Sequence, residues 1–325
     1  MSGADLGPRG QEPGPGLVKR ACDGDVRALG RLISLVENGA PELRAVLREL
    51  APRTGRAQVV GLTGAPGVGK STVTGALVAV YRERGLRIAV LAIDPTSPFT
   101  GGALLGDRVR MQQHATDQGV FIRSMANRGH LGGLAGAAPQ ALHVLDAAGF
   151  ELILVETVGV GQAEVEIAAL ADSTLVIVAP GLGDAIKAAK AGILEIGDVF
   201  VVNKSDKPGA QETVRDLRGM IAMAQRGPDD WKPPIVRTAA ADGEGIAELA
   251  AKIDAHQAWL DASGEGERRR LARARGEITT LALAELRQRM GALPGGSAVD
   301  ELALRVAAGE LDPYSAADEL IAAAS

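Results

Sequence analysis

The sequence predicts an α/β fold in which a mainly parallel sheet is flanked by helices. Between residues 58 and 260, apolar runs of strand length alternate with amphipathic stretches of helical spacing, a pattern typical of a parallel sheet covered on both faces. A glycine-rich loop, GAPGVGKS at residues 64–71, stands between the first apolar run and a helical stretch. This is the strand–loop–helix setting of the phosphate-binding loop, and it indicates a P-loop NTPase.

Seven segments are expected as strands, and helical stretches lie between most of them. The expected strands are residues 59–63, 87–94, 120–124, 151–156, 174–179, 199–203 and 235–238. Ligands of such sheets bind at the carboxyl ends of the strands. Each motif described below follows one of these strands.

Helical patterns flank the strand-rich region on both sides. Residues 1–15 are rich in Gly and Pro and are expected to be disordered. Residues 17–50 have apolar positions at helical spacing and predict a preface of two or three helices, and the tail predicts helices at 267–290, 299–308 and 315–324. The expected domains are 1–55 (tail and helical preface), 56–262 (P-loop domain) and 263–325 (helical extension).

The P-loop residues predict a site for a nucleotide's phosphates. Its glycines let backbone N–H groups turn toward an anion, and the next helix adds its positive amino-terminal end. Lys70 is expected to reach the β- and γ-phosphates, and the Ser71 hydroxyl to bind Mg²⁺. The predicted phosphate-binding residues are Gly64, Ala65, Pro66, Gly67, Val68, Gly69, Lys70, Ser71 and Thr72.

A second motif, Asn203-Lys204-Ser205-Asp206, directly follows an expected strand. It matches the NKxD motif of GTPases, whose aspartate accepts hydrogen bonds from guanine. Adenine lacks that pair of donors and would leave a buried carboxylate unpaired, so the motif favours GTP and GDP over ATP. The predicted base-binding residues are Asn203, Lys204 and Asp206, with Thr238, Ala239 and Ala240 closing over the base.

The γ-phosphate sensor is expected where the strand 151–156 ends, at Glu156-Thr-Val-Gly159. Glu156 can serve Mg²⁺, and the Gly159 N–H can contact the γ-phosphate. Val160 stands where Ras-like enzymes carry the glutamine that orients water, so intrinsic hydrolysis should be slow. Asp94 and Asp107 bracket a Gly-rich segment that could order around the metal and the γ-phosphate, although Asp107 also suits a helix N-cap.

Composition excludes several other classes. The net charge of −5 gives no electrostatic reason to expect nucleic-acid binding. The single cysteine, Cys22, suits a reducing compartment, no run approaches the length of a membrane span, and no signal peptide is evident. A cytoplasmic protein with no membrane partner is expected. The run Arg268–Arg270 is interpreted as a solvated or ion-paired helix face.

The sequence also resembles the MeaB/ArgK family, the GTPases associated with methylmalonyl-CoA mutase, within the SIMIBI class that includes the signal-recognition-particle GTPases. The resemblance spans residues 26–323 and is carried by stretches that occur in the family's order. These stretches are residues 94–102, 105–111, 128–133, 156–162, 203–206 and 311–318.

This resemblance implies a chaperone that uses GTP to gate the loading and protection of adenosylcobalamin in a partner acyl-CoA mutase. It further implies a homodimer formed through the C-terminal helices, and the mutase's adenosyltransferase as a second candidate partner. By the same resemblance, adenosylcobalamin is bound by the partner mutase and is a cofactor of this chain only through that partner. By resemblance Asp94, Asp107 and Glu156 surround Mg²⁺ with Ser71, and the catalytic set is Lys70, Asp94, Asp107, Glu156 and Gly159. Lys190 matches the family in a loop at 181–190, whereas Lys187 replaces its usual glutamine.

Four other functions stay open at the level of sequence. A nickel-inserting GTPase would normally carry a His tract or a Cys pair, but this chain has four scattered histidines and one cysteine. A small-molecule kinase using ATP conflicts with Asp206. A MinD/NifH-like ATPase has a lysine where this chain has Ala65. An RNA-binding protein using residues 268–275 conflicts with the acidic balance.

Overall fold

The computed structural model describes residues 16–94, 114, 116–126, 134–157, 163–181, 195–223, 227, 229–291 and 298–324. The chain forms two compact units, one up to Leu271 and one from Ala272 on. Residues 1–15, expected to be disordered, lie outside the described part. The predicted bounds 56–262 of the P-loop domain stay a prediction.

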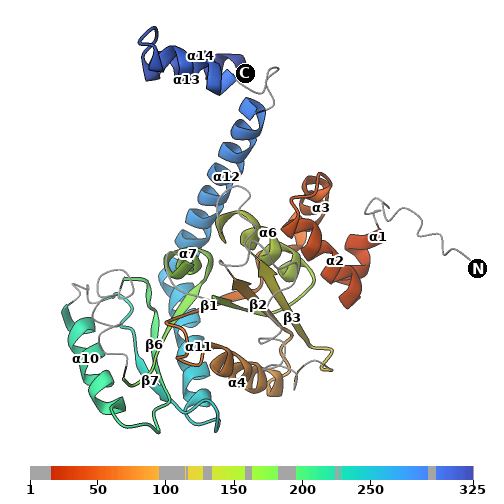
Figure 1. The fold of residues 1–325 in the computed structure, drawn as a ribbon. Coiled ribbons are helices and arrows are strands. Elements are labelled where there is room, and N and C mark those ends of the chain that lie inside the picture. The colour runs from red at the N-terminus through yellow and green to blue at the C-terminus, as the bar shows by residue number, and fades with distance from the viewer. Residues whose placement is uncertain are drawn as a thin grey trace, which may run out of the picture. The chain divides into compact units, whose positions relative to one another are not determined.

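The first unit is built on a seven-stranded sheet whose paired strands are all parallel (Figure 1). The strands are β1 (Gln58–Thr63), β2 (Ile88–Asp94), β3 (Val120–Ala126), β4 (Leu152–Thr157), β5 (Ser173–Val178), β6 (Val199–Asn203) and β7 (Ile235–Thr238). All seven predicted strands are present within two residues of their expected bounds. The predicted α/β architecture is confirmed.

The strand order is β3-β2-β4-β1-β5-β6-β7. From β1 the chain runs outward through β2 to β3, and then returns to place β4 directly beside β1. The later strands β5, β6 and β7 extend the sheet on the other side of β1. The carboxyl end of β1 therefore lies at the point where the chain changes direction, which is where ligands of open α/β sheets bind.

Helices cover both faces of this sheet and bury its apolar side chains (Figure 1). On one face α4 (Lys70–Glu83) and α11 (Ile246–Ser263) pack on a core that includes Val60, Leu62, Leu154 and Ile177. On the other face lie α6 (Leu134–Ala147), α7 (Ala163–Leu170) and α10 (Ala210–Met223). Burial of strands on both faces explains why they read as continuous apolar runs in the sequence.

The amino-terminal helices belong to the first unit. They are α1 (Gly16–Cys22), α2 (Val26–Glu37) and α3 (Leu43–Leu50), followed by the 3₁₀ turn η1 (Ala51–Arg53). Asp25 caps α2 by accepting from the backbone N–H of Arg27 at 2.9 Å and of Ala28 at 3.1 Å. Glu37 pairs with Arg123 of β3 at 2.6 Å. The predicted helical preface is present and is joined to the edge of the sheet.

The second unit is helical, as the tail predicts. Helix α12 (Glu265–Gly291) begins in the first unit and continues into the second, which also holds α13 (Ala298–Ala307) and α14 (Pro313–Ala324). Arg305 of α13 pairs with Glu319 of α14 at 2.7 Å. Within the described residues, no helix has the length and hydropathy that crossing a membrane requires.

Candidate functional site

The P-loop connects β1 to α4 and needs glycine at two of its positions. Gly64 has φ +144°, and a Cβ there would lie 2.1 Å from the carbonyl oxygen of Ile177 in β5. Gly69 has φ +96°, and its Cβ would lie 2.4 Å from Nδ2 of Asn203. Both positions combine a left-handed backbone with a close neighbour, so the loop can take this path only with glycine. Pro66, Gly67 and Thr72 are exposed on the loop and the first turn of α4.

Lys70 begins α4 and is largely buried. Its ammonium donates to the carbonyl oxygen of Gly64 at 2.7 Å and to that of Ala65 at 3.3 Å. These loop carbonyls hold the charge against the inner side of the P-loop. An ammonium held there is placed to bind the phosphates of a nucleotide that occupies the loop.

Glu156, at the end of β4, is 2% exposed and forms a polar cluster with α4. It accepts a hydrogen bond from the Ser71 hydroxyl at 2.5 Å and another from the Thr74 hydroxyl at 2.9 Å. Ser71 and Glu156 are thus brought together as the sequence predicts. Thr74 was not predicted, but it lies three residues after Ser71 and therefore on the same helix face.

The oxygen groups of this cluster fit Mg²⁺. A carboxylate and a hydroxyl are the hard oxygen ligands that this ion prefers, and a buried carboxylate gains stability from a nearby cation. The hydroxyls of Thr63 and Thr157, fully buried at the ends of β1 and β4, have no hydrogen-bond partner among the residues that the structure describes. Ser71 and Glu156 would hold the ion.

The other predicted metal and γ-phosphate residues are only partly located. Asp94 ends β2, which pairs with β4, so its backbone lies beside that of Glu156's strand. Asp107 and Gly159 lie outside the described residues, and so do Val160, Lys187 and Lys190. Within the described part of the chain, no group of three His, Cys, Asp or Glu side chains is close enough to hold a metal.

Asn203 joins three parts of the site from the end of β6. Its Nδ2 donates to the carbonyl oxygen of Val68 at 2.8 Å, and its Oδ1 accepts from the Thr238 hydroxyl at 3.0 Å and from the Ala240 N–H at 3.2 Å. Lys204, with φ +57°, donates to the carbonyl oxygen of Gly67 at 2.8 Å. The two side chains brace the P-loop and the segment after β7, which includes Ala239, against one another.

Asp206 points its carboxylate toward Lys207, at 2.9 Å, and is 40% exposed. The hydrogen bond from Lys207 and the charge of Lys204 lower the pKa of this carboxyl, so it is ionised at neutral pH. The sequence interpretation assumed a buried carboxylate. In the structure the guanine base itself would have to cover Asp206, and the base would meet an ionised acceptor.

The chain is similar to known proteins over most of its length. The family described as "Methylmalonyl Co-A mutase-associated GTPase MeaB" matches residues 29–294. A relative from Pyrococcus abyssi is 48% identical over 307 residues, covering 94% of this chain and 95% of the relative. The "Methylmalonic aciduria type A homolog, mitochondrial" of Caenorhabditis elegans is 35% identical over 272 residues, covering 78% of this chain and 68% of the relative.

A solved structure has the same fold. The crystal structure of an LAO/AO transport system kinase superposes with a TM-score of 0.70 at 26% identity, covering 94% of this chain and 95% of that one. The similarity therefore extends over the helical ends of the chain as well as the sheet.

Proposed function

Because the chain belongs to the MeaB family of methylmalonyl-CoA mutase-associated GTPases, we propose that it gates the loading and protection of adenosylcobalamin in a partner acyl-CoA mutase. GTP hydrolysis is the family's activity. The proposed partner is methylmalonyl-CoA mutase or a close relative, with the mutase's adenosyltransferase as a further partner. The cofactors of the chain itself are GTP or GDP and Mg²⁺.

The observation that carries the GTPase part is the brace between the two motifs. Asn203 and Lys204 hydrogen-bond the P-loop carbonyls of Val68 and Gly67, so the phosphate site and the base site are fixed to one another. Ser71 and Glu156 then provide oxygen groups for Mg²⁺ at the inner end of the loop. Support for the mutase comes from the family's description and from the name of the C. elegans relative.

The first test measures GTP turnover with and without the mutase. With valine at position 160, where a water-orienting glutamine would be needed, the isolated protein should turn over well below about 10 s⁻¹, a typical enzyme rate. Adding the mutase should raise the rate, and transfer of cobalamin to the mutase should require hydrolysable GTP. A rate unchanged by every candidate mutase, with no nucleotide-dependent transfer, would refute the chaperone role but leave the GTPase assignment intact.

A second test concerns the oligomer. In the second unit and the adjoining part of α12, large apolar side chains are exposed, among them Ile278 (68%), Leu304 (72%) and Ile321 (57%). Exposed apolar surface of this kind is typical of an interface, and we propose that it forms a two-fold dimer through residues 263–325.

The dimer prediction is best tested by a chain that ends after Leu271. This end retains Arg269, which hydrogen-bonds Asp198 of the first unit, so the P-loop domain keeps its own contacts. In multi-angle light scattering the full chain of 33.4 kDa should have twice its own mass, and the shortened chain should be a monomer. A shortened chain that is still dimeric would place the interface elsewhere.

A second candidate function, phosphoryl transfer to a small molecule, is favoured by the name of the LAO/AO transport system kinase. The ionised Asp206 argues against ATP as the donor. Competition between nucleotides for the site would distinguish the two: GTP and GDP should bind far more tightly than ATP. Equal affinity, together with labelling of an added amino acid by the γ-phosphate, would favour the kinase.

A further inference from the structure

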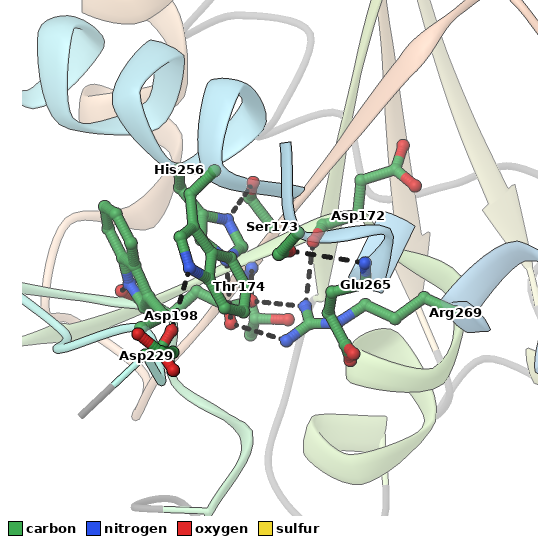
Figure 2. A network of polar contacts seen from close by, with 11 residues as sticks. Asp172, Ser173, Thr174, Asp198, Asp229, His256, Glu265 and Arg269 are labelled. Atoms are coloured by element: carbon green, nitrogen blue, oxygen red, sulfur yellow. Dashed lines mark hydrogen bonds and ion pairs between the residues drawn. The ribbon is translucent and has the colours of Figure 1, made fainter. Parts of the chain in front are cut away.

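A buried polar network (Figure 2) lies where the inner strands β5 and β6 begin. It is formed by Asp172, Ser173 and Asp198, together with His256 of α11 and Arg269 of α12. The nucleotide motifs follow the carboxyl ends of the strands, whereas this network lies at their amino-terminal ends. None of its residues belongs to the site described above.

Asp198 is the centre of the network. Its carboxylate accepts from the Thr174 N–H at 2.8 Å and from both terminal nitrogens of Arg269, at 3.0 and 3.1 Å. Arg269 also donates to the carbonyl oxygen of Asp172 at 2.9 Å and to Glu265 at 3.2 Å. This bidentate pair is the main polar attachment of the first turns of α12 to the sheet.

His256 shares the same carboxylate. It is fully buried, with Nδ1 2.7 Å from the Ser173 hydroxyl and Nε2 3.3 Å from Oδ1 of Asp198. The Nε2 contact lacks hydrogen-bond alignment. The rings of Trp231 and Trp259 pack against the imidazole, with centroids at 4.8 and 5.7 Å. A Ser–His–Asp set this deeply buried cannot reach a substrate, so it does not form a hydrolase site.

The imidazole is held neutral by its surroundings. Burial lowers the pKa of His256 most, the charge of Arg269 lowers it further, and Asp198 and Asp172 raise it. The titratable groups that face it are Asp172 and Asp198 from the strands and Arg269 from α12, with Glu265 behind Arg269. Trp231 and Trp259 do not titrate. A proton on His256 would compete directly with Arg269 for Asp198.

We propose that Asp198, His256 and Arg269 form an acid-sensitive latch that fixes the start of α12 to the P-loop domain. With His256 neutral, Asp198 holds Arg269 and the latch is closed. When His256 takes a proton from solvent, its Nε2–H draws the Asp198 carboxylate away from Arg269, and the first turns of α12 are released. The released turns are the start of a helix that continues into the second unit.

The direction of the pH effect follows from linkage. The closed latch disfavours protonated His256, whereas the open latch exposes it to water and frees Asp198 to pair with it. Acid therefore favours the open form, beginning as pH falls below the ordinary histidine pKa of about 6.5. At a pH one unit below this pKa, the population of the open form should be roughly tenfold higher than at neutral pH, if the closed latch does not bind the proton.

The experiment measures amide hydrogen exchange of residues 265–271 in the intact protein with GDP and Mg²⁺, at pH 7.5 and at pH 5.5. The measured exchange rates are divided by the intrinsic exchange rate at each pH, so that protection can be compared. Protection in the wild type should fall by roughly tenfold at the lower pH. His256→Gln cannot titrate and should show no change in protection. Arg269→Gln should be unprotected at both values. Arg268→Gln removes a neighbouring arginine that pairs with Glu265 and is 80% exposed, and it should behave like the wild type.

The proposal is overturned if protection in the wild type is the same at both pH values, or if His256→Gln keeps the full response. It is also overturned if Arg269→Gln stays protected. Retained GDP binding shows that each variant is folded, because none of these residues touches the nucleotide site. Should a variant fail to fold, the imidazole can be titrated by NMR in the wild type. A His256 signal that titrates at the ordinary value, without a change at α12, would refute the latch.

Discussion

Replacing Lys70 with alanine is expected to lower the rate of GTP hydrolysis by about two to three orders of magnitude, the usual cost of losing one donor to developing charge. The ammonium is largely buried and held by the carbonyls of Gly64 and Ala65. It is therefore already placed where the β- and γ-phosphates must lie. Single-turnover hydrolysis, measured with GTP at saturation, gives the effect on the chemical step.

The same variant should retain GDP better than GTP, because GDP lacks the γ-phosphate that Lys70 is expected to bind and the base site is held by the contacts of Asn203 with Val68 and Thr238. Lys19→Ala, which removes an exposed lysine from α1, is the control for the loss of one positive charge. A Lys70→Ala protein that hydrolyses GTP at the wild-type rate would show that the phosphates are bound by other groups.

Replacing Gly64 with alanine is expected to abolish nucleotide binding and to destabilise the fold. The added Cβ would lie 2.1 Å from the Ile177 carbonyl oxygen, and φ is +144°. The obstacle is the backbone of β5, the strand beside β1, so the P-loop has to move. A backbone strain of this kind costs roughly 1–3 kcal/mol before the collision is counted. Thermal unfolding and binding of a fluorescent GDP analogue measure the two effects.

Gly67→Ala is the matched control. Gly67 also has a positive φ, +78°, but among the described residues no atom lies within 4 Å of its added Cβ. The substitution should lower the free energy of unfolding by about 1–2 kcal/mol, because alanine is less stable in the left-handed conformation. The loop should keep its path. Equal losses of stability and binding in the two variants would mean that the conformation of the loop matters, and not its contact with β5.

The inner strands β1, β4, β5 and β6 were predictable because they are buried on both faces. Runs such as Val199–Asn203 have no polar alternation and are bounded by charged or turn residues, so a single apolar signal defines both ends. The order of the strands was not predictable. The insertion of β4 between β1 and β2 depends on pairing between residues far apart in the chain, which local patterns do not encode.

The residues of the site also differ in how far local sequence patterns could predict them. Lys70, Ser71 and Asn203 belong to short contiguous motifs, and the structure brings their segments together. The latch had no such signal, because Asp198, His256 and Arg269 lie in three segments that are far apart in the sequence and belong to no shared motif. One expectation from the sequence did concern the latch: the run Arg268–Arg270 was interpreted as a solvated or ion-paired helix face. Arg269 of this run pairs with Asp198.

The central position of β1 also bears on how the protein is made. Its partners in the sheet are β4 and β5, so the strand that carries the P-loop leaves the ribosome long before either neighbour exists. At ordinary rates of translation the delay before β5 emerges is on the order of ten seconds. During this interval the apolar strands β1 and β2 have no complete sheet to join. We therefore expect a nascent chain of this protein to gain the ability to bind nucleotide late, and its exposed apolar strands to be prone to aggregation until then.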